Sequence, residues 1–99
     1  MLHIVNKSPF QTSTLATCLR MAQGGDALLL IEDAVYAATA GSACEASLQA
    51  ACTTFKVYAL QPDMDARGVT PKLLPGITLV DYAGFVDLAV EHNTSHSWL

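Results

Sequence analysis

The chain has 99 residues, of which 52% are hydrophobic and 14% are charged, and its formal net charge is −4. This length predicts one domain, residues 1–99, and leaves no room for a second. Because a small monomer needs more charge than this on its surface, we expect other subunits to cover part of the chain.

Charge and hydropathy exclude two kinds of partner. The basic residues are few and scattered, so we expect no direct binding of nucleic acid: Lys7, Arg20, Lys56, Arg67 and Lys72. No apolar run is long enough to span a membrane, and residues 1–6 do not resemble a secretory signal, so we expect a cytoplasmic protein. Three cysteines without paired spacing fit a reducing compartment and argue against a disulfide framework.

Strand and helix patterns alternate along the chain. Strands are predicted at residues 2–5, 27–31, 55–60 and 77–80. Helices are predicted from the hydroxyl residues 12–14 to about 23, at 34–39, 43–51 and 82–92, with a single turn at 63–68. This order implies right-handed βαβ units and a mostly parallel sheet between helices, an α/β three-layer sandwich.

The segment 27–31 is the centre of this scheme. Its five apolar residues show no alternation, which is typical of a strand covered on both faces. Glu32 and Asp33 follow it, at the edge where α/β proteins bind ligands. We expect Asp33 to cap the helix at 34–39, rather than to form an acid pair of the phosphorylation type, which would need a lysine. Arg67 reads as part of a helix end that could also bind a partner carboxylate.

The last third of the chain contains one amphipathic pattern. Asp81 is expected to cap the helix at 82–92. Its apolar residues predict a broad buried stripe: Phe85, Val86, Leu88, Ala89 and Val90. The tail at 93–99 is polar except for Trp98 and Leu99, and no element is predicted there.

Cys18 is the candidate catalytic residue. Thr14, Thr17 and Arg20 surround it on the predicted helix, and a nearby cation would favour the reactive thiolate. The alternative is that Cys18 lies on the apolar stripe as a small core residue. Cys44 and Cys52 would be about 12 Å apart along one helix, too far for a disulfide, and are expected to be packing residues.

Other kinds of site find little support in the sequence. His92 and His96 could share one helix face, but no third ligand is suitably placed, so we expect no metal site. Gly24 and Gly25 precede a strand instead of opening a helix, the wrong order for a phosphate loop. No Ser-His-Asp arrangement is present, and no cofactor is expected.

Several segments together resemble the TusB/DsrH family. They are MLH at 1–3, NKSPF at 6–10, LLLIEDAVYAA at 28–38, VYAL at 57–60, DARG at 65–68, VDYAGFVDL at 80–88, and Trp98. The resemblance implies a DsrE-like fold and a heterohexamer with two copies each of TusB, TusC and TusD, or of DsrH, DsrF and DsrE. Such complexes relay cysteine persulfide sulfur, either to 2-thiouridine in tRNA or in sulfur oxidation, with a DsrC/TusE-like protein as a further partner.

The resemblance also bears on the cysteines. Cys18 lies where DsrH-type members carry a helix cysteine, which places the chain closer to DsrH. The main persulfide cysteine of the family belongs to the TusD/DsrE-like subunit, whereas Gln61, Pro62 and Asp63 follow the third strand here. We therefore expect a subunit that is not catalytic alone. Either Cys18 accepts a persulfide, or the chain only supports the subunit that carries the active cysteine.

Overall fold

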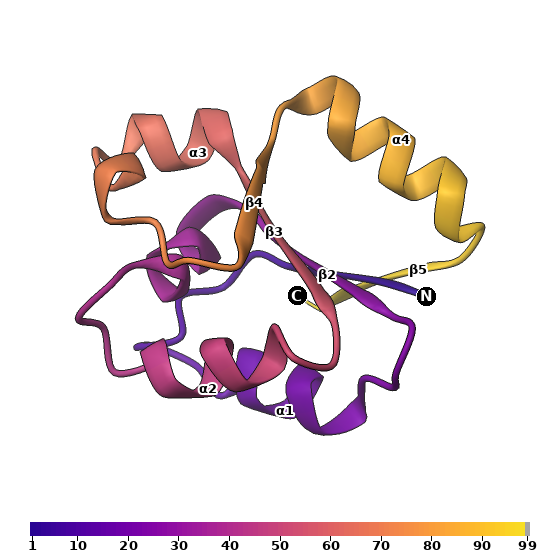
Figure 1. Cartoon of the computed structure of the whole chain (residues 1–99), viewed down its shortest axis with the longest axis horizontal. Helices are drawn as coiled ribbons and strands as arrows, with labels where there is room; N and C mark the ends of the chain where they lie inside the picture. Colours follow the sequence, from indigo (N-terminus) through magenta and orange to yellow (C-terminus); the bar gives the residue numbers. More distant parts are fainter. Residues whose placement is uncertain (99) are drawn as a thin grey trace.

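A five-stranded, all-parallel sheet forms the centre of the computed structural model, which describes residues 1–98 (Figure 1). Its order is β4-β3-β2-β1-β5. The strands are β1 (Leu2–Val5), β2 (Ala27–Leu30), β3 (Lys56–Leu60), β4 (Ile77–Val80) and β5 (Ser95–Trp98). The first four confirm the predicted strands, and β5 lies in the tail where none was predicted. Leu99 lies outside the described residues.

β2 occupies the central position, as its sequence predicted. All four of its residues are buried. β1 and β3 pair with it in parallel, so that Leu28 lies opposite His3 on one side and Val57 on the other. A strand in this position has no side chain facing solvent, which explains the absence of alternation in its sequence.

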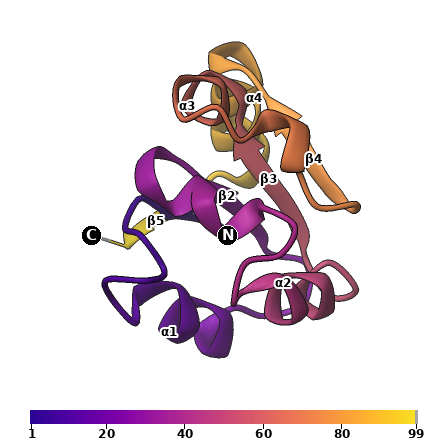
Figure 2. The same cartoon turned by 90° about the vertical axis from the view of Figure 1, so that its left-hand side faces the viewer.

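Helices cover the sheet on both faces, which confirms the predicted three-layer α/β architecture (Figure 2). The α-helices of the described chain are α1 (Thr14–Met21), α2 (Glu45–Ala51), α3 (Gln61–Ala66) and α4 (Tyr82–His92). Two 3₁₀ helices, η1 (Glu32–Ala38) and η2 (Thr70–Lys72), follow β2 and α3. The predicted turn at 63–68 corresponds to α3 and to Gly68, whose φ of 67° ends it.

Chain direction explains which helix covers which face. From β1 to β4, each new strand lies next to the previous one toward the same edge of the sheet. The chain then returns, and β5 lies beside β1 at the opposite edge. Right-handed crossovers therefore place α1 and α2 on one face and α4 on the other. The larger core cluster includes Leu15 of α1 and Leu48 of α2, and the smaller one includes Leu29 of β2 and Leu88 of α4.

The prediction that Asp33 caps a helix is wrong. The segment after β2 is the 3₁₀ helix η1, which has Ile31 at its N-cap and no side-chain cap. Glu32 has a φ of 50°, so the backbone turns sharply as it leaves β2. The Asp33 carboxylate instead accepts hydrogen bonds from Arg67, at 3.1 Å from Nε and 2.9 Å from Nη2.

The final helix confirms one prediction and corrects another. Asp81 caps α4, because its Oδ1 accepts a hydrogen bond of 2.8 Å from the backbone N–H of Gly84. The predicted broad buried stripe is wrong, since Leu88 is the buried residue of α4, whereas Val86 and Val90 are exposed. Only the inner side of the helix contacts the sheet.

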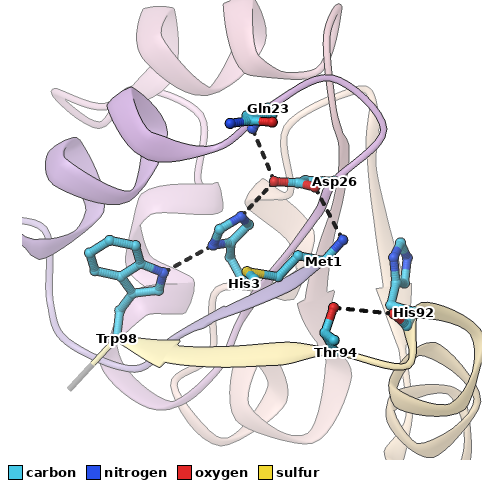
Figure 3. A network of polar contacts seen from close by, with 7 residues as sticks. All are labelled: Met1, His3, Gln23, Asp26, His92, Thr94 and Trp98. Carbon is cyan, nitrogen blue, oxygen red and sulfur yellow. Dashed lines mark hydrogen bonds and ion pairs between the residues drawn. The ribbon is translucent and has the colours of Figure 1, made fainter.

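A polar network holds β5 against β1 (Figure 3). His3 is 5% exposed. Its Nδ1 lies 3.1 Å from Trp98 Nε1, and its Nε2 lies 2.8 Å from Asp26 Oδ2. Asp26 also accepts hydrogen bonds from the backbone N–H of Gln23 and from the Met1 amino group. Residues from both ends of the chain and from the turn before β2 therefore meet at one point.

The hydrogen-bond partners of His3 determine which tautomer its imidazole adopts. An indole N–H can only donate, so His3 Nδ1 accepts from Trp98, and the proton of the neutral ring lies on Nε2, which donates to Asp26. The hydrogen bond from Gln23, then that from His3 and the charge of the Met1 amino group, lower the pKa of Asp26 to about 2. The network satisfies the buried ring, so β5 is held by side chains as well as by its strand hydrogen bonds.

The Trp98→Phe variant tests the role of this network in docking β5. It should lower the free energy of unfolding by about 1 to 2 kcal/mol, because a nearly buried imidazole nitrogen loses its donor. Amide hydrogen exchange of residues 95–98 should also become faster. Ser97→Ala, a change at an exposed position of the same strand, is the control. Equal effects of the two substitutions would show that the indole N–H does not hold β5.

Asp26→Asn tests the charge in the network. Its low pKa means that the folded state favours the carboxylate, which stabilises the fold above about pH 4 and stops doing so as the pH falls toward about 2. The variant should therefore be less stable than the parent by about 1 to 2 kcal/mol at pH 7, and this difference should shrink below pH 4. Urea unfolding at several pH values measures it, with Asp87→Asn on the exposed side of α4 as the control. A difference that does not depend on pH would contradict this account.

Candidate functional site

All three cysteines are free and lie on the α1 and α2 side of the sheet. Cys18 is on α1 and is fully buried. Cys44 and Cys52 are the N-cap and C-cap residues of α2 and are half-buried against the larger core cluster. This agrees with the prediction that they are packing residues.

The surroundings of Cys18 oppose thiolate formation. Burial, with a smaller contribution from the Asp26 carboxylate, raises the pKa of the Cys18 thiol to about 11. Arg20, the cation expected to favour the thiolate, donates to the Thr17 hydroxyl at 3.4 Å instead. Thiolates rather than thiols are nucleophiles, so the folded chain holds Cys18 in its less reactive form.

Cys44 lies in a more accessible place that the sequence did not reveal. A groove of about 440 Å³ runs between the loop after β1 and the helices α1 and α2. It is lined by Pro9, Phe10, Gln11, Thr12, Ser13, Leu15, Ala16, Leu19, Cys44 and Ser47. Partial burial raises the pKa of Cys44, as it does for Cys52. The sequence does not predict that Phe10 and Cys44 line the same groove, because only the packing of α1 beside α2 brings them together.

The carboxyl edge of β2 and β3 does collect polar groups, as predicted. Asp33 follows β2, and Asp63 and Arg67 follow β3. Asp63 Oδ2 accepts a hydrogen bond of 2.7 Å from the backbone N–H of Glu32, and the Asp63 carbonyl accepts from Arg67 Nη1 at 3.3 Å. Arg67 is the C-cap of α3, which confirms the predicted helix end. Its guanidinium pairs with Asp33 of its own chain.

This edge has no sulfur nucleophile. α3 begins directly after β3 with Gln61, and Pro62 lies in its first turn. Asp33 is 55% exposed, so its ion pair with Arg67 is a surface contact that stabilises the fold by less than about 1 kcal/mol. The side chains that meet here join η1 to α3, and none of those named is a cysteine.

The two histidines of the metal-site hypothesis lie on different elements. His92 ends α4, and His96 is on β5, where its ring lies 4.6 Å from that of Trp98. Within residues 1–98, no three His, Cys, Asp or Glu side chains gather in a way that could hold a metal ion. None of the helices in this part of the chain has the length and apolar character needed to cross a membrane.

Comparisons with known proteins give consistent results. The family model described as "DsrH like protein" matches residues 7–95. Proteins named TusB from Shigella flexneri and from Escherichia coli strain K12 are each 43% identical over 98 residues, which cover 99% of this chain and all of the relative.

Solved structures share the fold at lower sequence identity. The crystal structure of the ychN protein from E. coli has a TM-score of 0.84 at 20% identity, with 97% of each chain covered. The protein of unknown function MTH1491 from Methanobacterium thermoautotrophicum has a TM-score of 0.73 at 13% identity, covering 97% of this chain and 95% of that one. At these identities the likeness concerns the fold alone.

Thiol labelling tests the burial of the cysteines. In the folded chain at pH 8, a maleimide should modify Cys44 and Cys52 at least about tenfold faster than Cys18, because Cys18 is both enclosed and protonated. Peptide mass spectrometry assigns each site, and labelling in denaturant provides the control, in which the three rates should converge. Rapid labelling of Cys18 in the folded chain would mean that α1 opens readily.

Proposed function

Because the chain belongs to the TusB/DsrH family, we propose that it is a subunit of a sulfur-relay complex of the TusBCD or DsrEFH type. The observation that carries this proposal is the 43% identity to TusB proteins along the whole length. In this role, residues 1–99 act as a single DsrE-like domain beside TusC/DsrF-like and TusD/DsrE-like subunits. A DsrC/TusE-like protein is the proposed sulfur acceptor.

The surroundings of the cysteines favour a structural role for this chain over a role as a sulfur carrier. The buried Cys18 thiol, with its pKa raised to about 11, is poorly suited to attack a persulfide. The edge after β3, where the family's main carrier has its cysteine, holds Gln61 and Pro62 here. The proposed contribution of this chain is therefore to position the subunit that bears the reactive cysteine.

The alternative, in which Cys18 carries sulfur, has a defined chemistry. The Cys18 thiolate would attack the outer sulfur of a partner's cysteine persulfide, forming a new S–S bond to Cys18 and breaking the bond inside the donor persulfide. The donor cysteine would leave as a thiolate, and Cys18 would hold the persulfide. This step requires that α1 move away from the core, because Cys18 is fully buried.

Two features favour different branches of sulfur metabolism. Identity to TusB proteins along the whole chain supports the tRNA 2-thiouridine branch. The placement closer to DsrH, and with it sulfur oxidation, rests on the single residue Cys18. We place more weight on the identity of the whole chain, so tRNA thiolation is the proposed destination of the sulfur.

Sulfur transfer through the assembled complex tests the role of Cys18. A complex containing Cys18→Ala should pass labelled sulfur from the donor to the acceptor protein at the parental rate, and in the parental complex no extra sulfur should appear on Cys18. Quenched samples analysed by non-reducing mass spectrometry report both quantities. Cys44→Ala is the matched control for replacing a thiol near α2.

The opposite result would identify Cys18 as a carrier. It would consist of a mass increase of one sulfur atom on Cys18 and a loss of transfer in Cys18→Ala, while the variant still assembles with its partners. If the parental chain does not co-purify with TusC/DsrF-like and TusD/DsrE-like subunits, the proposed function itself is wrong.

A further inference from the structure

The outer side of α4 is apolar although the chain itself leaves it uncovered. Tyr82, Val86 and Val90 are 61%, 60% and 72% exposed. Their spacing of four residues places them along one stripe of the helix, and Ala83 and Ala89 are exposed beside them. We call these five residues the α4 stripe. A helix that covers a sheet usually presents polar residues on this side.

The side of α4 opposite to the stripe packs against the sheet and so fixes the position of the stripe. Leu88 is buried in the smaller core cluster, and Phe85 packs against it. At the start of α4, the Cα hydrogen of Gly84 faces β4 so closely that an added Cβ would lie 3.0 Å from Val80 Cβ. Figure 1 shows α4 on the rim of the molecule, away from α1 and α2. The stripe is thus not needed for the chain's own core, yet it is held in place.

Charge beside the stripe indicates what kind of surface fits it. Asp87 and Glu91 are exposed and lie one helical turn apart along one edge of the stripe, and Asp81 precedes the helix. α4 carries no lysine or arginine. A second copy of this acidic chain would bring the same carboxylates and no cation from α4, whereas a different protein can supply opposite charge.

We propose that the α4 stripe binds another subunit of the relay complex through an apolar surface of that subunit edged by Lys or Arg. This rests on the proposed function and adds to it the face of the chain that the partner covers. Exposed apolar side chains would then become buried, and Asp87 and Glu91 would pair with the basic edge. The arrangement also explains why α4 has apolar residues on its outer side as well as on the side that packs against the sheet.

Binding of the parental chain and its variants to the purified TusC/DsrF-like and TusD/DsrE-like subunits tests this surface. Val86→Glu with Val90→Glu should raise the Kd for one of these subunits at least about tenfold, because two buried apolar contacts become charged. Met21→Glu is the matched control, since Met21 is 64% exposed on α1, and it should leave the Kd unchanged. Circular dichroism and thermal melting should show the same fold for all variants.

A second pair of substitutions tests the charge. Asp87→Lys with Glu91→Lys should weaken binding at low salt and reduce its dependence on salt, because the basic edge of the partner then meets like charge. If the parental chain binds the partner subunits and both pairs of substitutions leave the Kd unchanged, the α4 stripe is not the docking surface. The proposed function would still stand. If the stripe variants instead abolish only self-association of the isolated chain, a second copy is the occupant and the proposal is also overturned.

Discussion

The leucines of β2 point to opposite faces of the sheet, and neither face can be left to water. Leu28 and Leu30 belong to the larger core cluster and Leu29 to the smaller one. Burying each contributes about 2 kcal/mol, so a layer of helices is required on both sides. α1 and α2 cover one face, and the return of the chain to β5 carries α4 over the other. The need to cover both faces of β2 thus accounts for the layers and for the position of α4.

The same packing limits what the cysteines can do. Cys18 fills space in the larger cluster, and the exclusion of water that makes it a good core residue also keeps its thiol protonated. Cys44 is only half-buried, because α2 begins at the edge of the groove. These surroundings agree with the proposed role of the chain, in which a partner subunit carries the reactive sulfur.

Part of the exposed apolar surface lies on one helix of this structure. The excess of hydrophobic residues predicts coverage by other subunits. Of the large hydrophobic side chains that are exposed, Tyr82, Val86 and Val90 share one side of α4, whereas Met1, Phe10 and Met21 lie elsewhere. The sequence of α4 has apolar residues at more positions than one buried side of a helix needs. The pattern predicts one broad buried stripe, and the prediction fails because a sequence does not say which side of a helix faces its own sheet.

Local patterns in the sequence determined the four predicted strands, the cap at Asp81 and the α/β class, because each depends on residues that are neighbours along the chain. Family membership likewise follows from the sequence alone. Only the tertiary structure decided the rest. The polar segment β5 is a strand because it pairs with β1, and Trp98 adds a hydrogen bond to His3, 95 positions away. Asp33 pairs with Arg67, which the fold brings beside it, and does not cap a helix. The physical reason is that contacts between distant residues depend on how the elements pack, which no local pattern contains.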